Sequence, residues 1–261
     1  MSRPSRLEYA YAVGRVHALE NYLIHQAVFR EAAEATDFVS ALKIVYDAGN
    51  YGEDLIKVSN SKELDAVLFR EEENLKNLVG AILLEKDILK VMLLDESPEE
   101  ALAPAERSGN AFILGYVKCR IDTGNIKIFC RSMYLEIPEE KFEKLFLPGG
   151  TIAPQDFVGC YGLALHEACD RFQATAYHDL WKRGVDVFLE RQTFVELERR
   201  IEDFLMSYLR RAKHITFGPE PVFAYGLAKK RELALVRLLG LGKMMKLPAE
   251  LIKERISATY V

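Results

Sequence analysis

Apolar residues recur at every third or fourth position along most of this chain, which is the spacing of one face of an α-helix. The segment over residues 7–33 is the first example, and its apolar face carries Val13, Val16, Leu19, Leu23 and Ala27. The same spacing predicts helices over residues 37–46, 63–94, 110–133, 139–146, 156–177 and 195–213. Patches of β-like sequence, such as residues 186–189, are too short to make a sheet. The pattern therefore predicts an all-α fold.

The stretch over residues 217–243 has the clearest helix boundaries in the chain. Pro221 suits the first helical turn, where a missing N–H costs nothing, and Glu220 lies at the positive end of the helix dipole. Gly240 and Gly242 are residues typical of a helix end, so we expect the helix to stop there.

Proline and glycine mark three further boundaries. Pro248 opens another predicted helix directly after that stop. Residues 97–104 contain two prolines and indicate a turn or short connector, while residues 147–154 give the strongest loop signal in the chain.

The helical pattern is also repeated in the sequence. Residues 122–129 match residues 232–239 in chemical type at six of eight positions. Without a gap, residues 137–140 then fall opposite residues 247–250, and both segments carry a proline that starts a helix. A repeat of this kind indicates a fold built from copies of one unit, with no single active-site cleft implied.

A looser echo extends the repeat. Tyr46 precedes a Lys-Glu-Leu segment near residues 61–68, and Tyr177 precedes a Val-Glu-Leu segment near residues 194–201. The two echoes together predict pseudo-repeated helical bundles, two in number. We expect an N-terminal helix plus the first repeat over residues 1–146 and the second repeat over residues 147–261.

Composition narrows the class of protein. The 261 residues are 49% apolar and 28% charged, which are globular values, and the net charge of −4 argues against a general nucleic-acid binder. The four cysteines form no Cys-x-x-Cys pair, and no secretory segment follows Met1. The apolar run over residues 78–84 is far shorter than the roughly 20 residues that span a bilayer. We expect a cytoplasmic protein, soluble or peripheral to a membrane.

A search for catalytic, cofactor and metal chemistry gives weak signals. The segment from Gly240 to Lys243 lacks the first glycine and the hydroxyl of a phosphate-binding loop. Cys160, His166 and Cys169 fall in one predicted helix, but a zinc site needs a fourth ligand, and helical cysteines are more often small buried apolar residues. We predict no catalytic residue, no cofactor and no metal site.

Polar residues on the repeated helices have two interpretations. Asp122, Asn125 and Arg131 can form a polar site, or they can hydrogen-bond within the bundle and fix the junction between helices, which is the interpretation we favour. Two basic clusters are interpreted by default as solvated helix faces. The alternative is that they contact an acidic partner. These partner-contact candidates are Lys229, Lys230, Arg231, Arg210 and Arg211.

The C-terminal segment and its earlier copy resemble the C subunit of the archaeal and bacterial V/A-type ATPases, the counterpart of the d subunit of the eukaryotic V-ATPase. The resemblance covers most of the chain and is strongest after about residue 110. Its motif residues here are Asp122, Asn125, Arg131, Tyr177, Glu220, Tyr225, Glu232, Arg237 and Lys243. The chain departs from the pattern at Leu235, where the family usually has asparagine, and in showing two repeats where three are usual.

The resemblance implies a non-catalytic rotor part of a rotary ATPase. Such a protein lies on the cytoplasmic face of the membrane proteolipid ring, receives the foot of the central stalk and links ATP turnover to H⁺ or Na⁺ movement. It also implies peripheral membrane association through protein contacts and no nucleic-acid partner. Two alternatives are an unrelated helical scaffold or adaptor and, less favoured, a small α-helical enzyme with an unrecognised site.

Overall fold

The computed structural model describes residues 4–261, and within that range every regular element is a helix. The predicted all-α fold is confirmed. Short 3₁₀ turns are η1 (Arg6–Tyr9), η2 (Glu53–Lys57) and η3 (Arg211–His214). The α-helices are α1 (Ala10–Glu20), α2 (Gln26–Glu34), α3 (Phe38–Ala48), α4 (Ser61–Ile82), α5 (Lys86–Leu93), α6 (Pro98–Ser108), α7 (Ala111–Tyr134), α8 (Glu139–Phe142), α9 (Pro154–Val158), α10 (Leu165–Asp170), α11 (His178–Arg191), α12 (Val195–Arg210), α13 (Glu220–Met244) and α14 (Ala249–Lys253).

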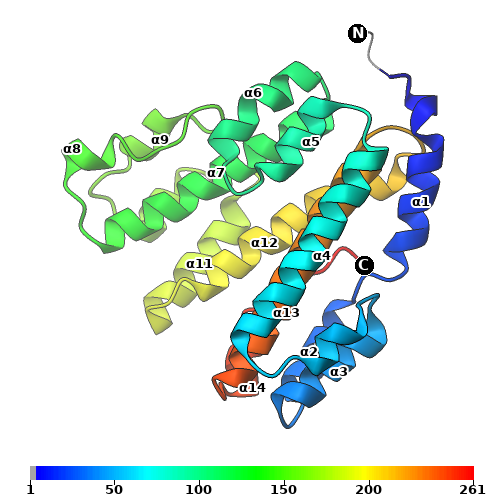
Figure 1. Ribbon diagram of the computed structural model, residues 1–261. Coiled ribbons are helices and arrows are strands. Elements are labelled where there is room, and N and C mark those ends of the chain that lie inside the picture. Colours follow the sequence, from blue (N-terminus) through cyan, green and yellow to red (C-terminus); the bar gives the residue numbers. More distant parts are fainter. Residues whose placement is uncertain (1–3) are drawn as a thin grey trace. The chain divides into compact units, whose positions relative to one another are not determined.

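The chain divides into two compact units. Unit 1 combines residues 4–92 with residues 206–261, and unit 2 holds residues 93–205. The first and last parts of the chain therefore build one unit together, as the blue and the orange-to-red segments of Figure 1 show. The division predicted between residues 146 and 147 falls inside unit 2. The boundary between the two sequence repeats therefore stays a prediction.

Unit 1 is built around α13. This helix packs against α4 along its length and also contacts α1, α2 and α3 (Figure 1). A helix that is apolar on all sides needs partners on all sides. Val222, Phe223, Val236 and Leu239 are fully buried on it. The apolar length of residues 217–243 is thus explained by a central place in a bundle.

Unit 2 has α7 as its long helix and an aromatic core. The helix packs against α6 and α9, while α10 packs against α11. Phe129 on α7 meets Trp181 on α11 edge to face, with ring centroids 5.5 Å apart, and also contacts Phe142 at 5.9 Å. Phe157 joins the same cluster at 6.2 Å from Phe129. These rings hold the short helices α8 and α9 on the long one.

The start of α13 is confirmed and its predicted stop is wrong. Pro221 lies in the first turn, but the helix continues through Gly240 and Gly242 to Met244. A Cβ on Gly240 would lie 2.5 Å from Leu64 Cδ2, and one on Gly242 would lie 2.9 Å from Ile252. These glycines therefore let neighbouring helices approach α13 closely and do not end it.

Both long helices end in the same way, so the ungapped repeat is present in the structure. The residue after α7 with left-handed backbone is Glu136 at φ 50°, and the one after α13 is Lys246 at φ 54°. Next in each copy, the backbone N–H of Ile137 donates to Ser132 at 3.0 Å, and that of Leu247 donates to Gly242 at 2.9 Å. A proline follows at once and starts α8 or α14, as predicted.

Two predicted helices are interrupted. Residues 7–33 form η1, α1 and α2, with a break over residues 21–25. Residues 63–94 form α4 and α5, with a break over residues 83–85. Apolar side chains are buried on both sides of each break, as Val16 and Phe29 are at the first and Val79 and Ile88 at the second, so the apolar periodicity does not reveal the breaks.

Other boundaries differ as well. The predicted connector over residues 97–104 belongs to α6, which starts at Pro98 and tolerates Pro104 in its interior while burying Ala101 and Ala105 against α7. The β-like patch at residues 186–189 lies in α11. The helix predicted over residues 139–146 ends at Phe142. The one predicted over residues 156–177 is divided into α9 and α10.

Candidate functional site

The strongest polar cluster of unit 2 is centred on the buried carboxylate of Asp122, which is 0% exposed in the middle of α7. It accepts hydrogen bonds from the backbone N–H of Thr151 at 2.9 Å, the Thr151 hydroxyl at 2.5 Å and the backbone N–H of Ile152 at 3.0 Å. The Tyr177 hydroxyl donates at 2.8 Å. Both carboxylate oxygens are thereby occupied in joining α7 to the following loop and to the segment before α11.

The loop over residues 147–154 is shaped to meet this carboxylate. Gly149 has φ 94°, a conformation that glycine adopts without strain. A Cβ on Gly150 would lie 2.0 Å from Asp122 Oδ1, so only glycine fits there. The two glycines of the strong loop signal are therefore explained by the approach of the loop backbone to one acid.

Asn125 holds the start of the same loop. Its side chain is fully buried, and it accepts from the Leu147 backbone N–H and donates to the Leu147 carbonyl, both at 2.8 Å. This pair satisfies two backbone groups that would otherwise be buried without partners. Asp122 and Asn125 thus bond within the bundle and fix a junction between helices, which confirms the favoured interpretation for these two residues.

Unit 1 has an equivalent junction at the matching repeat position, Glu232 on α13. This carboxylate is 3% exposed and accepts from the Ile24 backbone N–H at 2.7 Å and the Tyr51 hydroxyl at 2.7 Å. Lys229 donates to it at 2.5 Å and lies 4.2 Å over the Tyr51 ring. Again an acid in the centre of a long helix joins a loop N–H and a tyrosine.

The structure gives the tyrosine role in unit 1 to Tyr51. The looser sequence echo pairs Tyr46 with Tyr177, and this pairing is wrong because it is Tyr51 whose hydroxyl meets Glu232. The sequence holds a better signal, since Tyr51 lies between Gly49-Asn50 and Gly52 in a loop, where a side chain can turn inward.

Burial at the two junctions changes tyrosine acidity. Burial, with Glu232 as the next cause, raises the pKa of Tyr51 well above its ordinary value. Burial raises the pKa of Tyr177 too, with smaller contributions from Cys119 and Asp122. Burial and then Glu232 and Glu20 raise the pKa of Tyr225 to about 12. The three hydroxyls stay protonated near neutral pH, and those of Tyr51 and Tyr177 donate hydrogen bonds to the junction acids, which suits a structural role.

Most of the remaining family-motif residues also make internal contacts. Glu220 forms an ion pair with Arg6 at 3.1 Å, and Arg237 pairs with Asp65 at 2.8 Å. Lys243 donates to the Ala35 carbonyl at 2.6 Å. Within unit 2, Arg131 pairs with Glu198 at the surface.

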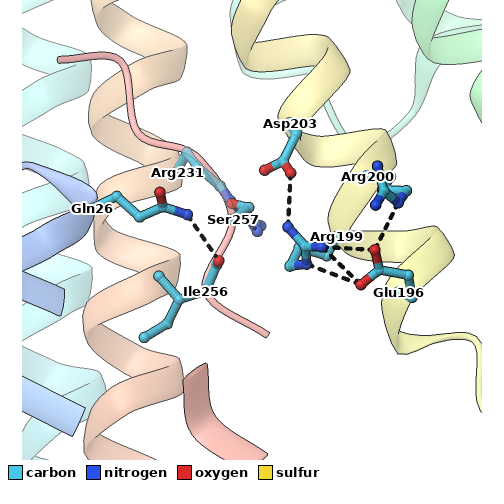
Figure 2. A network of polar contacts seen from close by, with 8 residues as sticks. All are labelled: Gln26, Glu196, Arg199, Arg200, Asp203, Arg231, Ile256 and Ser257. Atoms are coloured by element: carbon cyan, nitrogen blue, oxygen red, sulfur yellow. Dashed lines mark hydrogen bonds and ion pairs between the residues drawn. The ribbon is translucent and has the colours of Figure 1, made fainter. Parts of the chain in front are cut away.

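Four of the five partner-contact candidates are engaged inside unit 1. Besides the buried Lys229, Lys230 approaches the Met92 carbonyl at 3.4 Å, and Arg231 donates to the Ser257 hydroxyl at 2.7 Å (Figure 2). Arg210 donates to the carbonyls of the C-terminal segment. Only Arg211 among the five is exposed, with its guanidinium 4.8 Å over the Tyr208 ring.

The C-terminal segment is held in place by several such contacts. Gln26 donates to the Ile256 carbonyl at 3.2 Å, beside the Arg231 bond to Ser257 (Figure 2). Figure 2 also shows a separate network on α12 in which Arg199 and Arg200 share Glu196. These two α12 cations are matched by neighbouring acids, so they stabilise their own helix.

A cavity of about 320 Å³ opens beside the unit 1 junction. Tyr225 and Lys229 line it together with Glu71, Asn74 and several leucines. Since Lys229, the cation that lines it, is already paired with Glu232, the cavity is poorly suited to binding an anion. We assign no ligand to it.

The cysteines considered as candidate metal ligands lie in the interior of the protein. Cys160 and Cys169 are buried, and their thiols approach the backbone carbonyls of Asp156 and His178. Within residues 4–261, no group of three or more His, Cys, Asp and Glu side chains is arranged to hold a metal ion. None of the helices in this range is both long and apolar enough to cross a membrane.

Comparison with known proteins identifies the family. The sequence model described as the ATP synthase (C/AC39) subunit matches residues 84–255, which is more than half of the chain. This chain belongs to the ATP synthase (C/AC39) subunit family. Asp122, Glu232 and the ends of α7 and α13 fall inside the matched range.

A curated relative supports the same family. It is the C subunit of the V-type sodium ATPase of Enterococcus hirae, which is 35% identical over 86 residues. The alignment covers 33% of this chain and 26% of the relative. The resemblance to the C subunit of V/A-type ATPases is therefore confirmed. The aligned part spans about a quarter of that relative's length.

Proposed function

We propose that this protein is a non-catalytic adaptor of the central rotor in a V/A-type ATPase. In this role it links the central stalk to the membrane proteolipid ring, so that ATP turnover and H⁺ or Na⁺ transport are coupled. It lies on the cytoplasmic face of the membrane and is held there by protein contacts. The observation that carries the proposal is membership of the C/AC39 family over residues 84–255.

The junction chemistry supports a mechanical role. An adaptor that transmits torque needs stiff connections between its helices. Asp122 accepts from backbone and side-chain donors of two other segments, and Glu232 does the same in unit 1. Polar networks that are buried and fully bonded fix one arrangement of the elements around them. Their acids are also fully occupied, which does not suit a general base that must accept a proton from substrate.

Among the five basic candidates, we propose Arg211 as a contact to an acidic partner group. It is exposed, it has no acidic partner among residues 4–261, and it is the first residue of η3, directly after α12. The other four candidates would have to give up internal bonds before meeting a partner.

The experiment is affinity isolation of the tagged full-length chain from detergent-solubilised membranes, with the bound proteins identified by mass spectrometry. We expect proteolipid and stalk proteins to co-purify. If neither appears while the chain is folded by circular dichroism, the rotor proposal fails. Recovery of soluble partners alone would favour a scaffold outside the ATPase.

A charge-reversal variant tests the contact residue. Arg211→Glu should reduce recovery of stalk or ring proteins at physiological salt, since a favourable pair becomes a like-charge contact. Arg183→Glu on α11 is the matched control, because Arg183 is also exposed and makes no side-chain ion pair within residues 4–261. Equal recovery with both variants would exclude Arg211 as a contact.

A further inference from the structure

The last residue of α7 and the turn that follows it expose large apolar side chains in unit 2. Tyr134 is 53% exposed and Leu135 is 64% exposed. The Tyr134 ring packs edge-on against Phe188 and Phe194, whose rings stack at 4.2 Å. The aromatic base holds this turn in a defined position, while its apolar groups remain in contact with solvent.

The turn after α13 in unit 1 repeats this exposure. Met245 stands at the position equivalent to Leu135 and is 70% exposed. Each precedes the left-handed residue that ends the helix. The left-handed helix end depends on the backbone of Glu136 or Lys246 and does not require an apolar side chain at Leu135 or Met245. Because the same unnecessary apolar feature occurs in both copies, we attribute it to a contact outside the chain.

The charges of the two turns differ, and this difference points to the partner. After Leu135 come four exposed glutamates against two exposed lysines, Lys141 and Lys144. None of the four carboxylates has an ion pair or a hydrogen bond to another side chain within residues 4–261. In unit 1 the residue equivalent to Glu136 is Lys246. We name residues 134–143, which include Glu136, Glu139, Glu140 and Glu143, the acidic turn.

An acidic and apolar surface fits a partner that is basic and partly apolar. Membrane-embedded proteins supply such segments, because their cytoplasmic loops carry an excess of Lys and Arg and adjoin apolar helices. We propose that the acidic turn docks onto a basic cytoplasmic loop of the membrane-embedded ring. The inference rests on the rotor function proposed above and adds which surface of the chain meets the membrane part.

Bare lipid is a poorer partner for the acidic turn than a protein loop. The cytoplasmic leaflet has a negative surface potential, which repels four unpaired carboxylates. Protein loops that carry positive charge above that leaflet would attract them. Binding should therefore require the ring protein and should weaken at high salt, as expected for charge pairs exposed to solvent.

The test measures binding of the full chain to proteoliposomes that hold the purified membrane ring, and to protein-free vesicles of the same neutral and anionic lipids. The variant Glu136→Lys/Glu140→Lys reverses the acidic turn. Lysine is compatible with the backbone at residue 136, since Lys246 adopts the equivalent left-handed conformation. Glu99→Lys/Glu106→Lys on α6 is the matched control, because both are exposed acids of unit 2 outside the acidic turn and neither has an ion pair within residues 4–261. Unchanged circular dichroism and melting temperature will show that each variant is folded.

Wild-type chain should bind the ring proteoliposomes only, and the reversal should weaken binding by about tenfold or more, which corresponds to about 1.4 kcal/mol. Glu99→Lys/Glu106→Lys should stay within about threefold of wild type. If wild type binds the ring and the reversal has no effect, the acidic turn is not the docking surface and the rotor proposal stands. Equal binding of wild type to protein-free vesicles overturns the inference. If wild type binds neither, both proposals fail.

Discussion

Asp122 in unit 2 and Glu232 in unit 1 occupy the same repeat position, and a comparison of the two separates what the fold requires from what it leaves free. Both acids are buried, and both accept from a loop backbone N–H and a tyrosine hydroxyl. In unit 2 the loop and the tyrosine follow the helix in sequence. In unit 1 they come from the other end of the chain, around Ile24 and Tyr51. The junction is therefore a property of three-dimensional position, independent of chain order.

The two junctions differ in how the negative charge is balanced. Glu232 has a buried cation, Lys229, at 2.5 Å. Asp122 instead accepts from four neutral donors, two of them backbone N–H groups and two of them hydroxyls. Neutral hydrogen bonds can stabilise a buried carboxylate if enough of them converge. The repeat thus constrains the acid and leaves the means of balancing its charge to each unit.

Removing the acid from unit 2 should have the largest effect. Asp122→Ala leaves the N–H groups of Thr151 and Ile152 and the Tyr177 hydroxyl without an acceptor in a buried site. We expect a loss of about 4 kcal/mol in the free energy of unfolding. Hydrogen exchange should rise first in unit 2, including the loop over residues 147–154.

The control for that experiment is Asp122→Asn, which keeps one acceptor oxygen and should lose about half as much. If both variants unfold at the wild-type denaturant midpoint, the carboxylate does not hold the junction. If exchange rises equally in both units, the two units do not have separate stabilities.

The residues three positions after the two acids differ between the units. Exchanging them should give the next largest loss of stability. Asn125 clamps the Leu147 backbone, whereas its counterpart Leu235 is 1% exposed in an apolar core. Leu235→Asn buries an amide among apolar side chains and should cost about 3 kcal/mol. Asn125→Leu leaves the Leu147 N–H and carbonyl without their hydrogen-bond partner and should cost about 2 kcal/mol.

Urea denaturation of the two variants tests whether the units are interchangeable. If they were, Leu235→Asn would restore a missing clamp and raise stability, which is opposite to the expected sign. The double exchange should approximate the sum of the two losses, because residues in different units do not share partners.

The ion pair in unit 1 should contribute less than the loss expected for Leu235→Asn in the same unit. Glu232→Gln keeps acceptance from Ile24 but leaves Lys229 without its partner. We expect a loss of about 2 kcal/mol, smaller than for a fully enclosed pair, because Lys229 lines a cavity through which water can reach it. Adding Lys229→Met should recover part of that loss. Calorimetry should compare wild type, Glu232→Gln, Lys229→Met and the double variant. If the loss in the double variant equals the sum of the losses in the two single variants, the ion pair makes no contribution.

The parts of the fold that follow from the sequence are those with a local signal. Glycines and prolines predict the loop over residues 147–154, and the contact of Gly150 with Asp122 explains one of them. The proline that follows each long helix predicts the repeated helix ends. All-α architecture and the internal role of Asp122 and Asn125 also follow from pattern and residue type.

The features that the sequence does not reveal depend on partners that are distant along the chain. The break between α1 and α2 has no proline or glycine, and the N–H of Ile24 within it bonds to Glu232, which lies 208 residues later. Periodicity cannot reveal such a bond. Gly240 and Gly242 are misleading for the same reason, since the neighbours that require them, Leu64 and Ile252, come from other helices.

Glycines on two helices of unit 2 provide the smallest effects and the most direct contrast. A Cβ on Gly184 of α11 would lie 2.7 Å from Leu197 Cβ and 2.9 Å from its Cα, so the backbone of α12 would have to move. Gly184→Ala should therefore cost about 1 kcal/mol. A Cβ on Gly124 of α7 would meet no atom within 4 Å beyond its own stretch of helix, and Gly124→Ala should gain about 0.7 kcal/mol from better helix propensity. The two melting temperatures should move in opposite directions from wild type. A loss with Gly124→Ala would show that the open face of α7 is covered in solution, and equal gains would show that α11 and α12 pack less closely than the structure indicates.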